Sequence, residues 1–127
     1  MLPMLMGVAR GVVCMGISMF AGQALANGAL AIDSNQGSRW GWAVSYPSMG
    51  AAEQHALREC GRGCGIVMRF PSGCGAYAAD QAGGSTVYGW ATAGSAGAAQ
   101  SRAMQECSSR GGPRSSCVVR VWGCNSR

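Results

Sequence analysis

GALAIDSNQGSRWGWAVSYPSMGAAEQHALRECGRGC, residues Gly28–Cys64, decides the fold of this chain because the stretch occurs twice. The second copy is Gly75–Cys117, GAYAADQAGGSTVYGWATAGSAGAAQSRAMQECSSRGGPRSSC. The shared residues keep one order: Ala29, Ala31 and Asp33 match Ala76, Ala78 and Asp80, Gly41-Trp42-Ala43 matches Gly89-Trp90-Ala91, Ser48 matches Ser95, and Glu59-Cys60 matches Glu106-Cys107. An internal repeat of this kind indicates one supersecondary unit used twice.

Each copy predicts strand, strand, helix and strand. In the first copy, alternating apolar residues, turn residues and aromatic or β-branched residues favour strands at 29–33, 40–46 and 66–70. A helix begins after the N-cap Ser48, carries an apolar stripe at spacings of three and four, and ends at Gly61 and Gly63.

The second copy repeats this plan with strands at 76–79, 88–93 and 118–122 and a helix over 95–107. Neither copy can bury both faces of its own hairpin, so we expect the two to complete one sheet with both helices packed on it. The predicted fold is therefore α+β, a duplicated ββαβ unit with a mainly antiparallel sheet.

The start of the chain has the pattern of an export signal. An apolar run, GVVCMGISMFA, is too short to span a bilayer and is followed by Ala24-Leu25-Ala26, small residues of the kind found at a cleavage site. We expect cleavage after Ala26, with an uncleaved anchor as the alternative. Residues 1–26 are then a signal peptide, and residues 27–127 a single secreted or periplasmic domain of two repeats (28–73 and 74–125) without a stable membrane span.

Seven cysteines are present, and Cys14 lies in the predicted signal peptide. Six cysteines in a small exported domain predict a disulfide framework, which in principle allows 15 pairings. Two of these cysteines end equivalent helices and two begin equivalent strands, so the repeat favours Cys60–Cys64, Cys107–Cys117 and, with the remaining pair, Cys74–Cys124.

The charge pattern does not single out a partner. The formal net charge is +5, and the positive side chains that contribute to it are all arginine. These arginines are scattered along the chain, which favours a solvated surface over a nucleic-acid interface and leaves weak attraction to anionic envelope polymers open.

The chain also resembles a family of secreted bacterial proteins, domain of unknown function 4189. The marks are Gly28-Ala29-Leu30-Ala31, Trp40-Gly41-Trp42, Tyr46-Pro47-Ser48, Cys60-Gly61, Cys64, Phe70, Cys74-Gly75-Ala76 and Trp122-Gly123-Cys124-Asn125. The resemblance implies the first local and the long-range disulfide, with Cys107–Cys117 as an elaboration. It implies no activity and no catalytic residues. Some family members occur beside interbacterial toxin genes, which implies an immunity-type role by association only.

The residues themselves favour no catalytic, cofactor or metal site. The single histidine, His55, is matched by Arg102 in the second copy and is expected on the surface, opposite the apolar stripe. Disulfides account for the cysteines better than zinc does. Asp33 and Asp80 are expected to cap turns rather than to act as a carboxylate pair, and the glycine-rich turns lack the ending of a phosphate-binding loop.

Four aromatic residues form the candidate binding surface. Each copy places two of them on one face of a strand with a glycine between, and core packing is the alternative to a binding role. If that sheet face is open, the surface consists of Trp40, Trp42, Tyr88 and Trp90 with Arg39 and Arg120.

We therefore expect a non-enzymatic interaction domain that binds a protein partner, as an immunity protein or inhibitor does. The alternative is a cationic envelope-associated module that binds an anionic cell-wall polymer. A small hydrolase is the least favoured of the three hypotheses.

Overall fold

The computed structural model describes residues 26–33 and 38–126. The strands are β1 (Asn27–Asp33), β2 (Trp40–Tyr46), β3 (Cys64–Phe70), β4 (Cys74–Asp80), β5 (Tyr88–Ala93) and β6 (Cys117–Cys124). The helices are α2 (Met49–Cys60), α3 (Ala96–Gly111) and a short 3₁₀ turn, η1 (Gly112–Arg114). The described chain thus runs strand, strand, helix, strand in each half, and the α+β class is confirmed. The predicted signal peptide lies outside the described residues, apart from Ala26.

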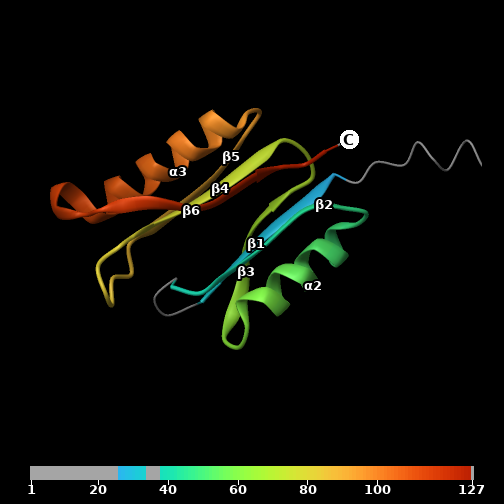
Figure 1. Ribbon diagram of the computed structural model, residues 1–127, viewed down its shortest axis with the longest axis horizontal. Helices are drawn as coiled ribbons and strands as arrows, with labels where there is room; N and C mark the ends of the chain where they lie inside the picture. The colour runs from blue at the N-terminus through green and yellow to red at the C-terminus, as the bar shows by residue number, and fades with distance from the viewer. Residues whose placement is uncertain (1–25, 34–37, 127) are drawn as a thin grey trace, which may run out of the picture.

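The strands form two sheets rather than the single sheet expected from the sequence. One sheet has the order β2-β1-β3 and the other β5-β4-β6, and all their pairings are antiparallel. The sheets lie face to face, with β2 against β6 and β3 against β5, and each helix covers the outer face of its own sheet (Figure 1). The expectation of one sheet was wrong because both faces of each hairpin are apolar. Helices on one side alone would leave the aromatic side in water.

The two halves use the same register between the central strand and the last strand. In the first half Asp33 pairs with Cys64, and in the second half Asp80 pairs with Cys117. A register shift interrupts the central strand's pairing in each half, between Leu30 and Ala31 in one and between Tyr77 and Ala78 in the other, which are matched positions. The pairing of the central strand with the last strand therefore agrees between the halves, down to an irregularity that disrupts the ladder. The first hairpin has a further register shift, between Asn27 and Ala29, that the second hairpin lacks.

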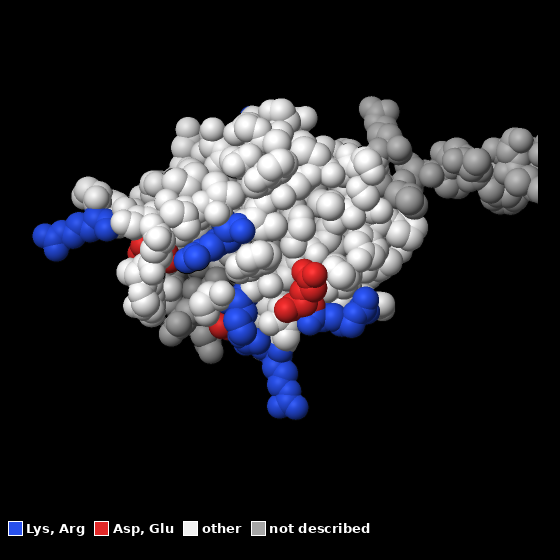
Figure 2. Space-filling view, viewed as in Figure 1, with Lys and Arg blue, Asp and Glu red and all other residues white. Residues whose placement is uncertain are grey.

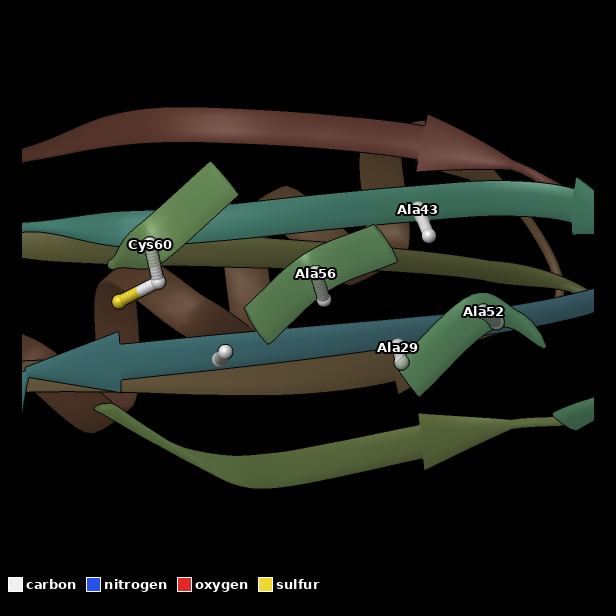
Figure 3. Packing of buried hydrophobic residues seen from close by; sticks show 6 residues of the cluster. Ala29, Ala43, Ala52, Ala56 and Cys60 are labelled. Atoms are coloured by element: carbon white, nitrogen blue, oxygen red, sulfur yellow. The ribbon is translucent and has the colours of Figure 1, made fainter. Parts of the chain in front are cut away.

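Small residues bring each helix close to its sheet. The fully buried part of the contact between α2 and its sheet is made of alanines and one cysteine, with larger, partly buried side chains around it. Figure 3 shows the buried part: Ala29, Ala31, Ala43, Ala52, Ala56 and Cys60. A Cβ atom on Gly41 would lie 1.8 Å from the main-chain oxygen of Ala56, and one on Gly89 would lie 2.4 Å from the nitrogen of Cys107. The glycine between each pair of aromatic residues is thus where the helix backbone meets the strand.

The helix starts are those predicted. The hydroxyl of Ser48 accepts a hydrogen bond from the Ala51 nitrogen at 3.1 Å, and that of Ser95 accepts one from Ala98 at 3.3 Å. Gly61 ends α2 with a φ of 99°, a conformation that favours glycine. The second helix runs four residues beyond its predicted end, as far as Gly111.

The described residues contain three disulfides, Cys60–Cys64, Cys74–Cys124 and Cys107–Cys117, which are the pairs expected from the sequence. The first lies in the first half and the other two in the second half. No helix in the described part of the chain is long and apolar enough to cross a membrane.

Asn125 joins the two halves without a covalent bond. Its side chain accepts a hydrogen bond from the Ser45 nitrogen at 2.8 Å and donates one to the Phe70 oxygen at 3.1 Å. Its main-chain nitrogen donates to the Gly73 oxygen at 2.9 Å. Ser45 has a φ of 62°, and its hydroxyl also contacts Ser126. The end of the second sheet is thereby tied to β2 and to the turn between the halves.

Candidate functional site

The four aromatic residues of the predicted surface lie in the layer between the two sheets. They are half-buried and pack against a buried cluster of residues from both halves: Leu30, Ile32, Met68, Phe70, Tyr77 and Ala79. The open sheet face on which the predicted surface depended is not present, since each sheet covers the other. The packing explains their spacing, because a strand that alternates aromatic residues and glycine turns the rings toward the second sheet and the glycine toward the helix.

Aromatic contacts extend from this layer to its margin. Tyr88 stacks on Trp90, with ring centroids 5.7 Å apart, and the Arg110 guanidinium lies 5.6 Å from the Trp90 ring centroid. The neighbouring Tyr77 is fully buried, and burial raises the pKa of its hydroxyl to about 12. These rings stabilise the layer between the sheets, and their contacts provide no groove for a ligand.

The two arginines of the predicted surface have different environments. The Arg39 guanidinium donates hydrogen bonds to the main-chain oxygens of Cys60 and Arg62, at the end of α2, and lies 3.8 Å from the Asp33 carboxylate. It therefore stabilises the end of a helix, where cations are favoured. Arg120 is exposed on β6, and its one hydrogen bond within the described residues goes to the main-chain oxygen of Asp80 at 3.4 Å.

Every acidic side chain of the described chain is engaged inside the molecule. Glu53 pairs with Arg69 at 2.7 Å, and Glu106 pairs with Arg110 at 3.6 Å. Asp80 caps turns, as expected: it accepts hydrogen bonds from the Ser116 nitrogen at 3.0 Å and the Ser85 hydroxyl at 2.9 Å. The hydrogen bond from Ser116, followed by that from Ser85, lowers the pKa of the Asp80 carboxyl below its usual value.

His55 is half-buried and paired rather than free on the surface. Its Nε2 atom lies 3.1 Å from the Glu59 carboxylate, and its ring lies 5.1 Å from that of Tyr46. The Glu59 carboxylate also accepts a hydrogen bond from the Trp42 nitrogen at 3.0 Å. In the second half, Arg102 instead donates to the Thr92 oxygen at 3.2 Å. His55 therefore links α2 to β2, and Arg102 links α3 to β5, so each position connects its helix to an edge strand of the sheet.

The unpaired charge of the described surface is positive. All described arginines are exposed, and those without a carboxylate partner within the described residues are Arg58, Arg62, Arg102, Arg114 and Arg120. In the view of Figure 2, arginine side chains project from the left and lower parts of the molecule, while the upper right of this face carries no charge. The described residues contain no pocket and no group of side chains suited to a metal ion.

The most exposed large apolar side chain of the described residues is Trp122 of β6, at 51%. Trp122 pairs with Ala76, and the matched Ala29 pairs with Arg69. At one position of the repeat, the first half therefore carries an ion pair with the helix above it, and the second half carries an exposed tryptophan. We call the exposed Arg120 and Trp122, with the outer edge of their strand, the β6 surface.

A family model described as a domain of unknown function (DUF4189) matches residues 27–124. The chain belongs to this family. The comparison with curated proteins gives no match, and neither does that with solved structures. The DUF4189 match spans both halves, so both helices and both sheets are part of the family domain.

Within this DUF4189 domain, sequence reasoning missed Trp122 as a surface residue. A signal was present, because Arg69 and Trp122 stand at the same distance after Cys64 and Cys117, the matched cysteines that begin β3 and β6. An alignment of the last strands of the two copies places Arg69 of the first copy and Trp122 of the second at the same position. That difference marks a position where the shared scaffold does not dictate the residue.

Proposed function

We propose that the protein is an exported, non-enzymatic interaction domain that binds a partner protein through the β6 surface. The observation that supports this proposal most is the exposed Trp122, which stands where the first half has the Arg69–Glu53 ion pair. The same scaffold accepts a charged pair at this position, so packing of the fold does not require a tryptophan.

Trp122 and Arg120 have the chemistry of a binding site for protein. Tryptophan and arginine are enriched among the residues that contribute most to protein–protein affinity. Here both are exposed and two positions apart on one strand. Binding would bury an apolar ring that now contacts water, and would offer a carboxylate to an arginine that has none among the described residues.

The disulfides support a location outside the cytoplasm, and therefore a partner in the envelope or outside the cell. Structural disulfides persist in oxidising compartments, and this fold contains three. The predicted signal peptide agrees with that placement.

Affinity capture tests the proposal. Oxidised protein of residues 27–127 would be immobilised and exposed to an envelope extract of the source cells, with reduced and alkylated protein as the control that lacks the fold. We expect one stoichiometric protein partner retained by the oxidised form alone. Absence of any such partner at both low and high salt would contradict the proposal.

An anionic cell-wall polymer is the second candidate ligand, favoured by the arginines that have no carboxylate partner. Many of these lie near helix ends, where arginine also stabilises the helix dipole. Binding to isolated cell wall that is lost between 50 and 500 mM salt, without a protein partner, would favour this candidate.

The proposal that the domain is non-enzymatic has its own test. The His55–Glu59 pair is engaged with Tyr46 and with the backbone of β2, an arrangement that supports a structural role. We expect His55→Ala to leave capture of the partner protein unchanged. Hydrolysis of any substrate that His55→Ala abolishes in a folded variant would overturn this view.

A further inference from the structure

The outer edges of β2 and β5 are capped by side chains of the adjacent helices. On β2, Glu59 of α2 accepts a hydrogen bond from the Trp42 nitrogen. On β5, Arg110 and Arg102 of α3 donate to the Tyr88 and Thr92 oxygens, at 3.1 and 3.2 Å. Unpaired edge groups invite pairing with another chain, and such caps block it.

The edge of β6 has no such cap. Among the described residues, no side chain forms a hydrogen bond with the main chain of Cys117–Cys124. The direction of its polar groups follows from β5: Thr92 turns its oxygen outward and pairs with Gly75, so Gly75 turns its own groups toward β6. Gly75 pairs with Gly123, and by alternation the adjacent Trp122 turns its N–H and C=O outward, away from β4.

The remaining edge strand, β3, differs in its side chains. At the position of Trp122 it carries Arg69, which is bound to Glu53, and its final oxygen accepts a hydrogen bond from Asn125. A charged residue on an edge strand disfavours pairing unless the incoming strand supplies the opposite charge, and Arg69 already has Glu53 as its partner. Within the described residues, the β6 edge therefore combines backbone groups that no side chain caps with an exposed aromatic side chain and an arginine that has no carboxylate partner.

From this combination we infer that the β6 surface binds its partner by β-strand addition. The ligand is an extended segment of a partner protein that pairs with β6, places a large apolar side chain beside Trp122 and carries an acidic side chain near Arg120, which stands at the register shift of β6 between Val119 and Val121. This inference rests on the proposed function and names the partner's chemistry. Backbone hydrogen bonds supply affinity in this mode, and alternate side chains supply specificity.

Charge selects the partner over a second copy of this chain. The net charge is +5, so two copies repel each other, and a pairing of β6 with a second β6 that is centred on Arg120 would place two like charges opposite each other. An acidic segment meets neither penalty.

A peptide of stated sequence tests the mode of binding. The probe is the capped peptide Thr-Phe-Val-Asp-Val-Thr, titrated against the disulfide-bonded domain by calorimetry and tryptophan fluorescence. One control peptide replaces its Asp with Lys, and a second carries N-methyl groups at alternate residues, which remove strand hydrogen bonds. We expect binding of the first peptide and at least a tenfold weaker binding of both controls. Equal binding of the N-methylated peptide, or no binding of the first peptide, would overturn strand addition.

Variants separate this inference from the proposed function. Trp122→Arg gives the second half the residue that the first half already carries, and Arg69→Trp is the matched control on β3. We expect Trp122→Arg to weaken capture of the envelope partner and binding of the peptide at least tenfold, and Arg69→Trp to change neither. A partner retained equally by Trp122→Arg would overturn strand addition at β6, while the domain would still bind a protein. A wild-type dimer that Trp122→Arg converts to a monomer would also overturn it, since the occupant would then be a second copy.

Discussion

Arg69 on β3 and Trp122 on β6 occupy the same position in two halves that agree in the register of the central and last strands, in the helix N-caps and in a disulfide from the helix to the strand that follows it. One half carries an ion pair between Arg69 and Glu53, and the other carries an exposed tryptophan. The scaffold tolerates either, so neither residue is needed to form the fold. A difference between matched positions is therefore a better guide to function here than any feature the halves share.

The two halves are expected to differ most in the free energy of unfolding that their disulfides contribute. The Cys74–Cys124 bond spans a sequence separation of 50 in the second half, and Cys60–Cys64 spans 4 in the first. By the loop-entropy relation, we expect replacing both cysteines by alanine to lower the free energy of unfolding by about 4 kcal/mol for the long bond and about 2 kcal/mol for the short one. Urea unfolding of the two variants measures this.

The third disulfide is the internal control. Cys107–Cys117, with a separation of 10, is expected to fall between them at about 3 kcal/mol. Equal losses for all three pairs would show that native-state contacts, and not chain entropy, set their contribution.

The glycine between the aromatic residues of each half allows a comparison of how closely the two helices contact their sheets. Because a Cβ on Gly41 approaches the helix backbone more closely than one on Gly89, we expect Gly41→Ala to cost about 3 kcal/mol and Gly89→Ala about 2 kcal/mol. Thermal and urea unfolding compare the two. Gly50→Ala and Gly97→Ala are matched controls in open space on the two helices, and should stabilise by up to about 1 kcal/mol. A Gly41→Ala variant as stable as these controls would contradict the close contact.

Low pH should destabilise the second half through protonation of the Asp80 carboxylate. Its folded-state pKa is lowered from 3.8, so the stability it contributes is present above that value and is lost as the pH falls through the lower folded-state pKa. We expect Asp80→Asn to be less stable than wild type at pH 6, and the difference to shrink as the pH falls below about 4. Circular dichroism melts from pH 6 to pH 2 measure this. Asp33→Asn at the matched position is the control, and a constant difference across the range would contradict the role of the carboxylate.

The β6 surface should show the smallest effect on stability. Trp122→Arg is expected to lower the free energy of unfolding by about 1 kcal/mol or less, because half of the residue is already exposed and the arginine stem covers part of the same surface. Arg69→Trp should cost under about 1 kcal/mol, the usual limit for a surface ion pair. Urea unfolding of both variants checks this. A loss above 2 kcal/mol for Trp122→Arg would show that the tryptophan belongs to the core.

Local features of this fold follow from sequence, and contacts between layers do not. Ser48 and Ser95 cap helices because their position before an apolar stripe is a local property. The local cysteine pairs form as expected because the repeat places one cysteine in the last part of each helix and one at the start of the strand that follows. The number of sheets was missed because alternation shows which residues share a face but not what covers it. The environment of Arg39 was missed for a similar reason, since its guanidinium contacts a helix end that is distant in sequence.

The layer between the sheets has the character of a subunit interface whose two subunits share one chain. None of the three disulfides crosses it. The turn Pro71-Ser72-Gly73 is the covalent link between the sheets, and Asn125 adds hydrogen bonds across the same junction. Residues 27–70 and 74–126, made as separate chains, should then associate as complementing fragments. A protein that reports reassembly of two fragments could be built by cutting the molecule at this turn.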